Sequence, residues 1–112
     1  MELWQKQAIF AQNIAFLLRY IHDQGYFVTF GEAFRTQEQA KIYAHEGKGI
    51  VDSLHCKRLA LDINLLNETG KYLIEYEDYK KFGDYWVTLH ENNRWCGSFK
   101  RVDSNHFEMQ DI

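Results

Sequence analysis

Two histidines and one aspartate stand out as residues that could bind a metal ion. The stretch DSLHCKRLALDI, residues 52–63, places His55 seven positions before Asp62, and the tail segment DSNHFEM, residues 103–109, carries His106. Two imidazoles and one carboxylate suit Zn²⁺, and three protein ligands leave its fourth position open for water. A metal in such an open site activates water and polarises a carbonyl group. The residue types therefore indicate one catalytic zinc ion rather than a structural one.

The position of Asp62 inside an apolar run predicts how it would reach a metal. Alternation along a strand over 59–66 would place the apolar Leu59, Leu61, Ile63 and Leu65 on one face, with Ala60, Asp62 and Asn64 on the other. A lone Asp62 would simply be exposed on the solvated face of the sheet. Because the spacing of seven to His55 is odd, a straight strand would put the two side chains on opposite faces. We therefore predict a loop that brings His55 round to Asp62.

Two further residues could complete the chemistry. Asp103 stands three positions before His106, near a ligand but free of coordination, and is the candidate acid–base for water; the HExxH motif is absent. Arg35, in EAFRTQEQA, could hold a substrate carboxylate or a developing oxyanion. An ion pair with Glu32 or Glu38 is the alternative interpretation of Arg35.

The elements that must position these residues follow from periodicity and from turn residues. The predicted order is a helix over 3–24, a strand over 26–34, a helix over 37–46 capped by Thr36 and ended by Gly47, a loop over 47–53, the strand over 59–66, a turn and return through 67–74, a helix over 77–90, and two short strands in the tail. Helices and antiparallel strands that do not alternate strictly indicate a small α+β domain with a central antiparallel sheet flanked by helices.

The composition limits the number of domains and the kinds of partner that the protein can have. The 112 residues are 46% apolar and 16% aromatic, and they contain no proline and no low-complexity tract, which predicts one domain over 1–112 without a separate wall-binding module. A net charge of −3 argues against a nucleic-acid partner. No segment is long enough to span a membrane, and the N-terminal apolar run, interrupted by polar residues, is expected to be a helix rather than a signal peptide. Cys56 and Cys96 make no disulfide framework, although one bridge between them stays open.

Three ordered motifs resemble a known family. SLHCKRLALD, residues 53–62, is similar to the SxHxxxxAxD pattern of zinc peptidases that include the D-alanyl-D-alanine carboxypeptidases and dipeptidases. DSNHFE resembles their second motif, and EAFRTQEQA resembles the arginine-bearing segment before the first. RWCGSF resembles a stretch of the bacteriophage L-alanyl-D-glutamate endopeptidases, the endolysin branch. The resemblance covers about residues 30–109, the motif-bearing core.

The resemblance implies roles for six residues. His55, Asp62 and His106 would be the zinc ligands and Asp103 the catalytic acid–base, while Arg35 and Ser53 would contact the substrate. The implied fold is shared with the Hedgehog signalling domain, and the implied substrate is bacterial peptidoglycan, cut at the L-alanyl-D-glutamate bond by a phage or prophage endolysin. A D,D-carboxypeptidase or dipeptidase of the same family, and a non-catalytic binding domain stabilised by zinc, are the alternatives.

The chain departs from the family pattern at two positions. Arg58 stands where glycine is common, and Cys96 stands where a second glycine is common. Cys96 could in principle add a fourth, thiolate ligand, which would close the site. A monomer is the expectation for a small hydrolase that must diffuse in a polymer mesh, and the absence of a visible signal peptide predicts synthesis in the host cytoplasm without membrane insertion. The endolysin analogy implies that the protein reaches the wall after the membrane is permeabilised.

Overall fold

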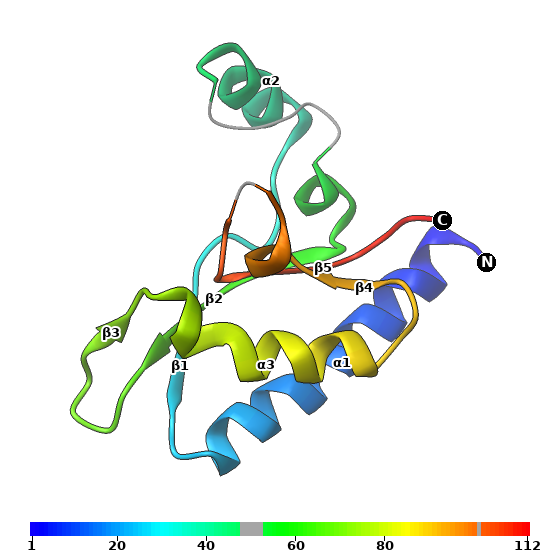
Figure 1. Ribbon diagram of the computed structural model, residues 1–112. Helices are drawn as coiled ribbons and strands as arrows, with labels where there is room; N and C mark the ends of the chain where they lie inside the picture. The colour runs from blue at the N-terminus through cyan, green and yellow to red at the C-terminus, as the bar shows by residue number, and fades with distance from the viewer. Residues whose placement is uncertain (48–52, 101) are drawn as a thin grey trace.

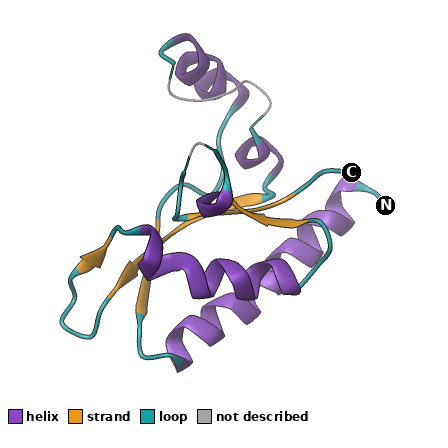
Figure 2. Ribbon diagram, in the orientation of Figure 1, coloured by secondary structure: helices purple, strands orange, loops and turns teal. Residues whose placement is uncertain are grey.

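The computed structural model describes residues 1–47, 53–100 and 102–112 and contains three α-helices, two short 3₁₀ helices and five strands (Figures 1 and 2). In chain order these are α1 (Leu3–Asp23), β1 (Phe27–Phe30), α2 (Gln37–His45), η1 (Leu54–Lys57), β2 (Ala60–Leu66), β3 (Tyr72–Leu73), α3 (Tyr76–Thr88), β4 (Asn93–Trp95), η2 (Cys96–Ser98) and β5 (His106–Met109). The predicted α+β fold class is confirmed. The loop predicted over 47–53 falls mostly outside the described residues.

The sheet is antiparallel throughout and has β2 at its centre. Its strand order is β1-β2-β5-β4, and β3 pairs with the far end of β2 after the turn at 67–70. The register places Asp62 of β2 directly opposite His106 of β5, and Arg94 of β4 directly opposite Glu108. Paired residues on neighbouring strands project on the same side of a sheet. Residues 44 positions apart in the sequence are therefore held side by side by backbone pairing.

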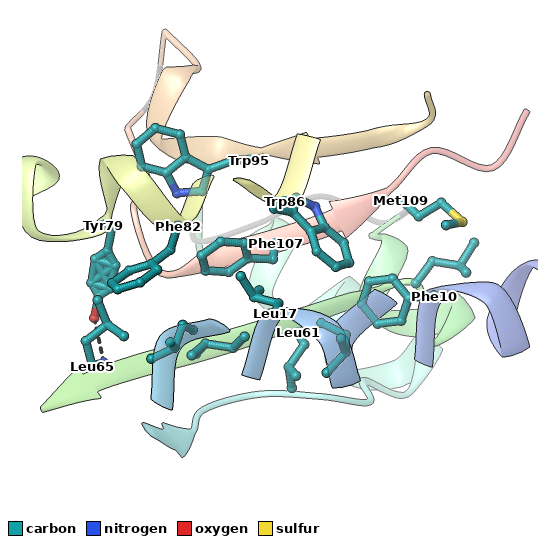
Figure 3. Close-up of a cluster of buried hydrophobic side chains, with 14 residues drawn as sticks. Phe10, Leu17, Leu61, Leu65, Tyr79, Phe82, Trp86, Trp95, Phe107 and Met109 are labelled. Atoms are coloured by element: carbon teal, nitrogen blue, oxygen red, sulfur yellow. Dashed lines mark hydrogen bonds between the residues drawn. The ribbon is translucent and has the colours of Figure 1, made fainter. Parts of the chain in front are cut away.

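One face of the sheet carries the hydrophobic core. The helices α1 and α3 pack against this face, and Figure 3 shows Phe10 and Leu17 facing Trp86 and Phe107. The four residues predicted to share the apolar face of β2 are all buried there: Leu59, Leu61, Ile63 and Leu65. Tyr79 ties α3 to β2, because its hydroxyl accepts a 3.0 Å hydrogen bond from the Leu65 amide, the dashed line in Figure 3. The opposite face is thereby left for polar side chains.

The first strand is shorter than predicted. The sequence indicates a strand over 26–34, whereas β1 ends at Phe30 and the chain leaves the sheet. The prediction was wrong in this bound because the bonding to β2 ends at Glu32, whose carbonyl accepts a 2.9 Å hydrogen bond from the Asp62 amide. Beyond it the chain bonds to η1, with the Arg35 amide donating to the His55 carbonyl at 3.3 Å. Gly31 lies close against β2 at this point, since a Cβ built there would lie 3.0 Å from the Cβ of Asp62.

The segment that follows carries α2, which lies on the other side of the sheet from α1 and α3 (Figure 1). Thr36 caps α2 as predicted, its hydroxyl accepting a 3.1 Å hydrogen bond from the Gln39 amide. Among the helices that the structure describes, none is long and apolar enough to cross a lipid bilayer.

Candidate metal centre

The three predicted metal ligands converge on the polar face of the sheet. Nε2 of His55 lies 3.4 Å from Oδ1 of Asp62, and Nδ1 of His106 lies 3.0 Å from the same oxygen. The two imidazole rings meet edge to face with centroids 4.9 Å apart. One ligand atom from each residue falls within 4.8 Å of the other two. The residues singled out for their types and spacing thus form one cluster.

His55 reaches this cluster from the short helix η1, as the odd spacing requires. Ser53 caps η1, its hydroxyl accepting a 3.2 Å hydrogen bond from the His55 amide. The helix ends at Arg58, whose φ of 56° is in the left-handed region, and the chain then enters β2. A left-handed φ is most easily adopted by glycine, so an arginine at this position is unusual. The predicted loop is confirmed.

The second ring nitrogen of His55 is held by the backbone. His55 is only 2% exposed, and its Nδ1 lies 3.2 Å from the carbonyl oxygen of Ala33. A carbonyl only accepts hydrogen bonds, so it fixes the proton on Nδ1. The lone pair of Nε2 then faces Asp62, which is the tautomer that a metal ligand needs.

The second ring nitrogen of His106 is held by a carboxylate. Nε2 of His106 lies 2.8 Å from Oε1 of Glu108, and the other oxygen of Glu108 is paired with the Arg94 guanidinium. Residues two apart on a strand share a face, so Glu108 is expected beside His106, but no role was predicted for Glu108 or for Arg94. The two-residue spacing from His106 to Glu108 on one strand was the available signal.

Asp62 and His106 shift each other's pKa in the direction that favours the charged form of each. Burial alone would raise the pKa of Asp62, but the neighbouring imidazoles of His106 and His55 outweigh that effect and hold the pKa of Asp62 well below its usual value. Burial alone would lower the pKa of His106, but its hydrogen bonds to Asp62, Cys96 and Glu108 raise that pKa far above its usual value. Asp62 is therefore an anion over the whole physiological range, as a metal ligand must be.

Asp103, the predicted acid–base, lies in the turn before β5, where its carbonyl accepts a 3.1 Å hydrogen bond from the His106 amide. It is exposed, and its carboxylate has no hydrogen bond or ion pair with another described residue. It borders a cavity of about 530 Å³ that Asn64, Asn105 and Tyr76 also line. The loop that carries Asp103 is held by Trp95, whose indole N–H donates a 2.7 Å hydrogen bond to the Ser104 carbonyl.

Arg35 and Ser53, predicted to contact substrate, lie on the His55 side. The Arg35 side chain donates a 2.8 Å hydrogen bond from Nε to Glu32 and stacks over Tyr43 at 5.0 Å. This is the ion-pair partner foreseen in the alternative interpretation. Glu32 in turn approaches His55, with its Oε1 3.7 Å from Nε2. Ser53 is buried and holds η1 in shape; for both residues, a contact with substrate stays a prediction.

Cys96, the possible fourth ligand, lies behind His106 rather than beside Asp62. Its sulfur is 3.7 Å from Oε1 of Glu108, and it belongs to a second cluster of possible metal ligands with His106 and Glu108. Burial raises the pKa of the Cys96 thiol. Both cysteines are free, so the bridge to Cys56 that the sequence left open is not formed.

The donor set of His55, Asp62 and His106 fits a zinc ion. Two imidazole nitrogens and one carboxylate oxygen are ligands that zinc takes in open sites, and each imidazole has its other nitrogen anchored, as is usual for metal-binding histidines. The residues could therefore hold the ion without rearrangement of the backbone.

The fold and this cluster define a small α+β domain whose antiparallel sheet carries a possible His-Asp-His metal site. No protein-family model matches the sequence, and no curated protein matches it. Among solved structures the fold is similar to the crystal structure of the L-Ala D-Glu endopeptidase ChiX from Serratia marcescens, with a TM-score of 0.73 and 18% sequence identity. The likeness covers 90% of this chain and 77% of ChiX. At this identity, the comparison shows a shared fold.

Proposed function

We propose that this protein is a zinc-dependent peptidase of the peptidoglycan stem peptide that cuts the L-alanyl-D-glutamate bond. The observation that carries the proposal is the convergence of His55, Asp62 and His106 within 4.8 Å on the polar face of the sheet. The shared fold with an L-Ala D-Glu endopeptidase and the three sequence motifs support the choice of substrate.

The proposed roles combine the sequence motifs with the positions of the residues. His55, Asp62 and His106 would hold the zinc ion, which when bound supplies a Lewis acid for water and for the substrate carbonyl. Asp103, exposed beside the cavity, would accept the proton of the attacking water and deliver it to the leaving amine. Its freedom from other partners among the described residues suits a group that must exchange protons in each turnover.

The cavity beside Asp103 offers peptide-binding groups. The Asn105 side chain donates a 3.1 Å hydrogen bond to Oδ1 of Asn64, and both side chains line the cavity. An amide pair of this kind keeps a further N–H and a further C=O for an extended peptide backbone. Arg35 would hold a substrate carboxylate only with the N–H groups that it does not give to Glu32.

The test is digestion of purified peptidoglycan followed by mass spectrometry of the released fragments. We expect new N-terminal D-glutamate from the wild type, none after a chelator, and none from Asp103→Asn, while the exposed Asp84→Asn serves as the matched control and retains activity. Release of free D-alanine instead would place the protein among the carboxypeptidases. Zinc binding without any product would support the non-catalytic binding domain.

We propose that the cellular role is that of a phage or prophage endolysin, on the sequence resemblance alone. Turbidity loss of bacterial cells with a permeabilised outer membrane measures this role. If the turbidity of the cells did not fall while purified peptidoglycan was still digested, the endolysin role would be wrong and the peptidase activity would stand.

A further inference from the structure

A network of polar groups, partly buried, lies behind His106 on the side away from Asp62. Arg94 of β4 and Glu108 of β5 are direct cross-strand partners, and their side chains form an ion pair. The other oxygen of Glu108 accepts hydrogen bonds from His106 Nε2 at 2.8 Å and from the Cys96 thiol at 3.7 Å. Glu108 is only 7% exposed. A carboxylate so enclosed is stable only when donors surround it, and here three donors do so.

This network of Arg94, Glu108 and Cys96 determines which ring nitrogen of His106 can bind a metal. A neutral imidazole carries one proton, and a carboxylate that accepts from Nε2 keeps the proton there. When His106 gives up its other proton to bind a metal, the lone pair of Nδ1 is offered beside Oδ1 of Asp62, 3.0 Å away, where the other ligand atoms converge. If the ring were turned or the tautomer reversed, Nδ1 would present a proton to the metal position.

We propose that Glu108, held in place by Arg94, is a positioning residue that fixes the tautomer and orientation of His106 for metal binding. The inference rests on the proposed function, since it assumes zinc on His55, Asp62 and His106. Glu108 plays for His106 the part that the Ala33 carbonyl plays for His55. A carboxylate adds charge, so it also makes the imidazole a stronger ligand.

The same atoms admit a rival arrangement. Cys96, His106 and Glu108 offer ligand atoms within 4.8 Å of one another and could themselves hold a metal. The guanidinium of Arg94, paired with Glu108, places a positive charge against that cluster and repels a cation. Cys96 and Glu108 are also buried, 6% and 7% exposed, so this cluster lacks an open side. The geometry thus favours Glu108 as the support of a ligand rather than as a ligand.

The experiment is a measurement of zinc affinity by competition with a chromophoric chelator. We expect Glu108→Ala to weaken zinc binding about 10- to 100-fold, the range typical of lost partners of metal-binding histidines. Glu108→Gln, which keeps an acceptor but loses the charge, should weaken it less, and Arg94→Met less again. Cys96→Ser keeps a donor to Glu108 and should bind zinc like the wild type. Asp84→Asn, which removes a carboxylate from an exposed ion pair on α3, is the matched control.

Circular dichroism and a thermal melt of each variant separate misfolding from weakened binding, and Glu108→Gln retains the shape of the site if Glu108→Ala unfolds. Wild-type affinity in folded Glu108→Ala or Glu108→Gln would overturn the inference. So would a thiolate charge-transfer band in the cobalt-substituted wild type that Cys96→Ser abolishes, because the metal would then lie in the rival cluster. Undiminished zinc binding by His55→Ala would instead refute the proposed metal centre itself.

Discussion

The two histidines of the candidate metal centre come from regions that are built differently. His106 lies on β5 and is placed opposite Asp62 by the pairing of β2 with β5, at the middle of the sheet. His55 lies on the four-residue helix η1, outside the sheet, and bonds to the irregular segment after β1. We call the part of the centre with Asp62 and His106 the strand side, and the part with His55 the η1 side. The strand side is fixed by the register of the backbone pairing, whereas the η1 side depends on a helix cap, a left-handed residue and a few hydrogen bonds.

The groups behind the two rings differ in charge as well. The Ala33 carbonyl behind His55 is neutral, but Glu108 behind His106 is a buried carboxylate paired with Arg94. His106 therefore lies between two carboxylates, Asp62 and Glu108, while His55 faces mainly Asp62. The strand side is therefore stabilised mainly by charge pairs, and the η1 side by local backbone geometry.

Removal of either ring should reveal this difference most strongly. In chelator-treated protein, we expect His106→Ala to lower the free energy of unfolding by about 3 kcal/mol, because it leaves two partly buried carboxylates without their shared partner. His55→Ala should cost less, since it removes a neutral hydrogen bond and a buried ring but no charge pair to Glu108. Urea denaturation measures both, and His22→Ala, at an exposed histidine, is the control. An equal or reversed order would refute the comparison.

The charge pairs of the strand side also predict a pH dependence after chelator treatment. The raised pKa of His106 contributes stability that is fully present below its unfolded value of 6.5 and is lost as pH rises toward the folded value. The lowered pKa of Asp62 contributes stability that is present above its unfolded value of 3.8 and is lost as pH falls through the folded value. We expect the melting temperature to be highest between these limits and to decline on both sides. In His106→Ala, the decline on the alkaline side should disappear.

Zinc should reverse the alkaline part of this profile. A histidine must lose its proton to bind a metal, so zinc binding becomes stronger as pH rises. Melting temperatures with saturating zinc should therefore hold or rise where those of the chelator-treated protein fall. Parallel curves with and without zinc would show that the ion does not bind His106.

The strand side is also braced from beneath by Trp95. A Cβ built on Gly83 of α3 would lie 2.0 Å from the Trp95 ring, and one on Gly97 would lie equally close on the ring. Gly83→Ala should therefore destabilise the protein by about 2 kcal/mol, because the indole has no room to move. It should also lower activity, since the Trp95 indole holds the loop of Asp103 through Ser104. Thermal melts and peptidoglycan digestion test both effects, with the exposed Asp84→Ala on the same helix as control; a fully active Gly83→Ala would contradict the bracing role.

The strand side was largely readable from the sequence. Alternation in β2 separated Asp62 from the leucines that pack on α1 and α3, and the tail placed His106 and Glu108 on one face. What the sequence could not predict was the cross-strand partner of Glu108, because the register of β4 against β5 is a tertiary property. The role of Arg94 could therefore not be predicted without the pairing of β4 with β5, which places it opposite Glu108.

The η1 side was predicted only in outline. The odd spacing from His55 to Asp62 required a loop, and a loop was found. The irregular path after Gly31, which brings Ala33 and Glu32 to His55, was read as a continued strand, because aromatic and β-branched residues favour strands wherever they occur. Local propensity carries no information about a segment whose hydrogen bonds go to a distant short helix.

Arg58 offers the smallest but most direct test of the η1 side. Its left-handed φ of 56° is unfavourable for a residue with a Cβ, while its guanidinium stacks over the Phe34 ring at 4.0 Å. The strain and the stacking are each worth about 1 kcal/mol and nearly offset each other. We expect Arg58→Ala, which keeps the strain and loses the stacking, to be destabilised by about 1 kcal/mol. Arg58→Gly loses both, so it should be close to the wild type and more stable than Arg58→Ala in a urea titration. If Arg58→Gly were the less stable of the two, the backbone at this position would not be strained, and stacking on Phe34 would alone explain the arginine.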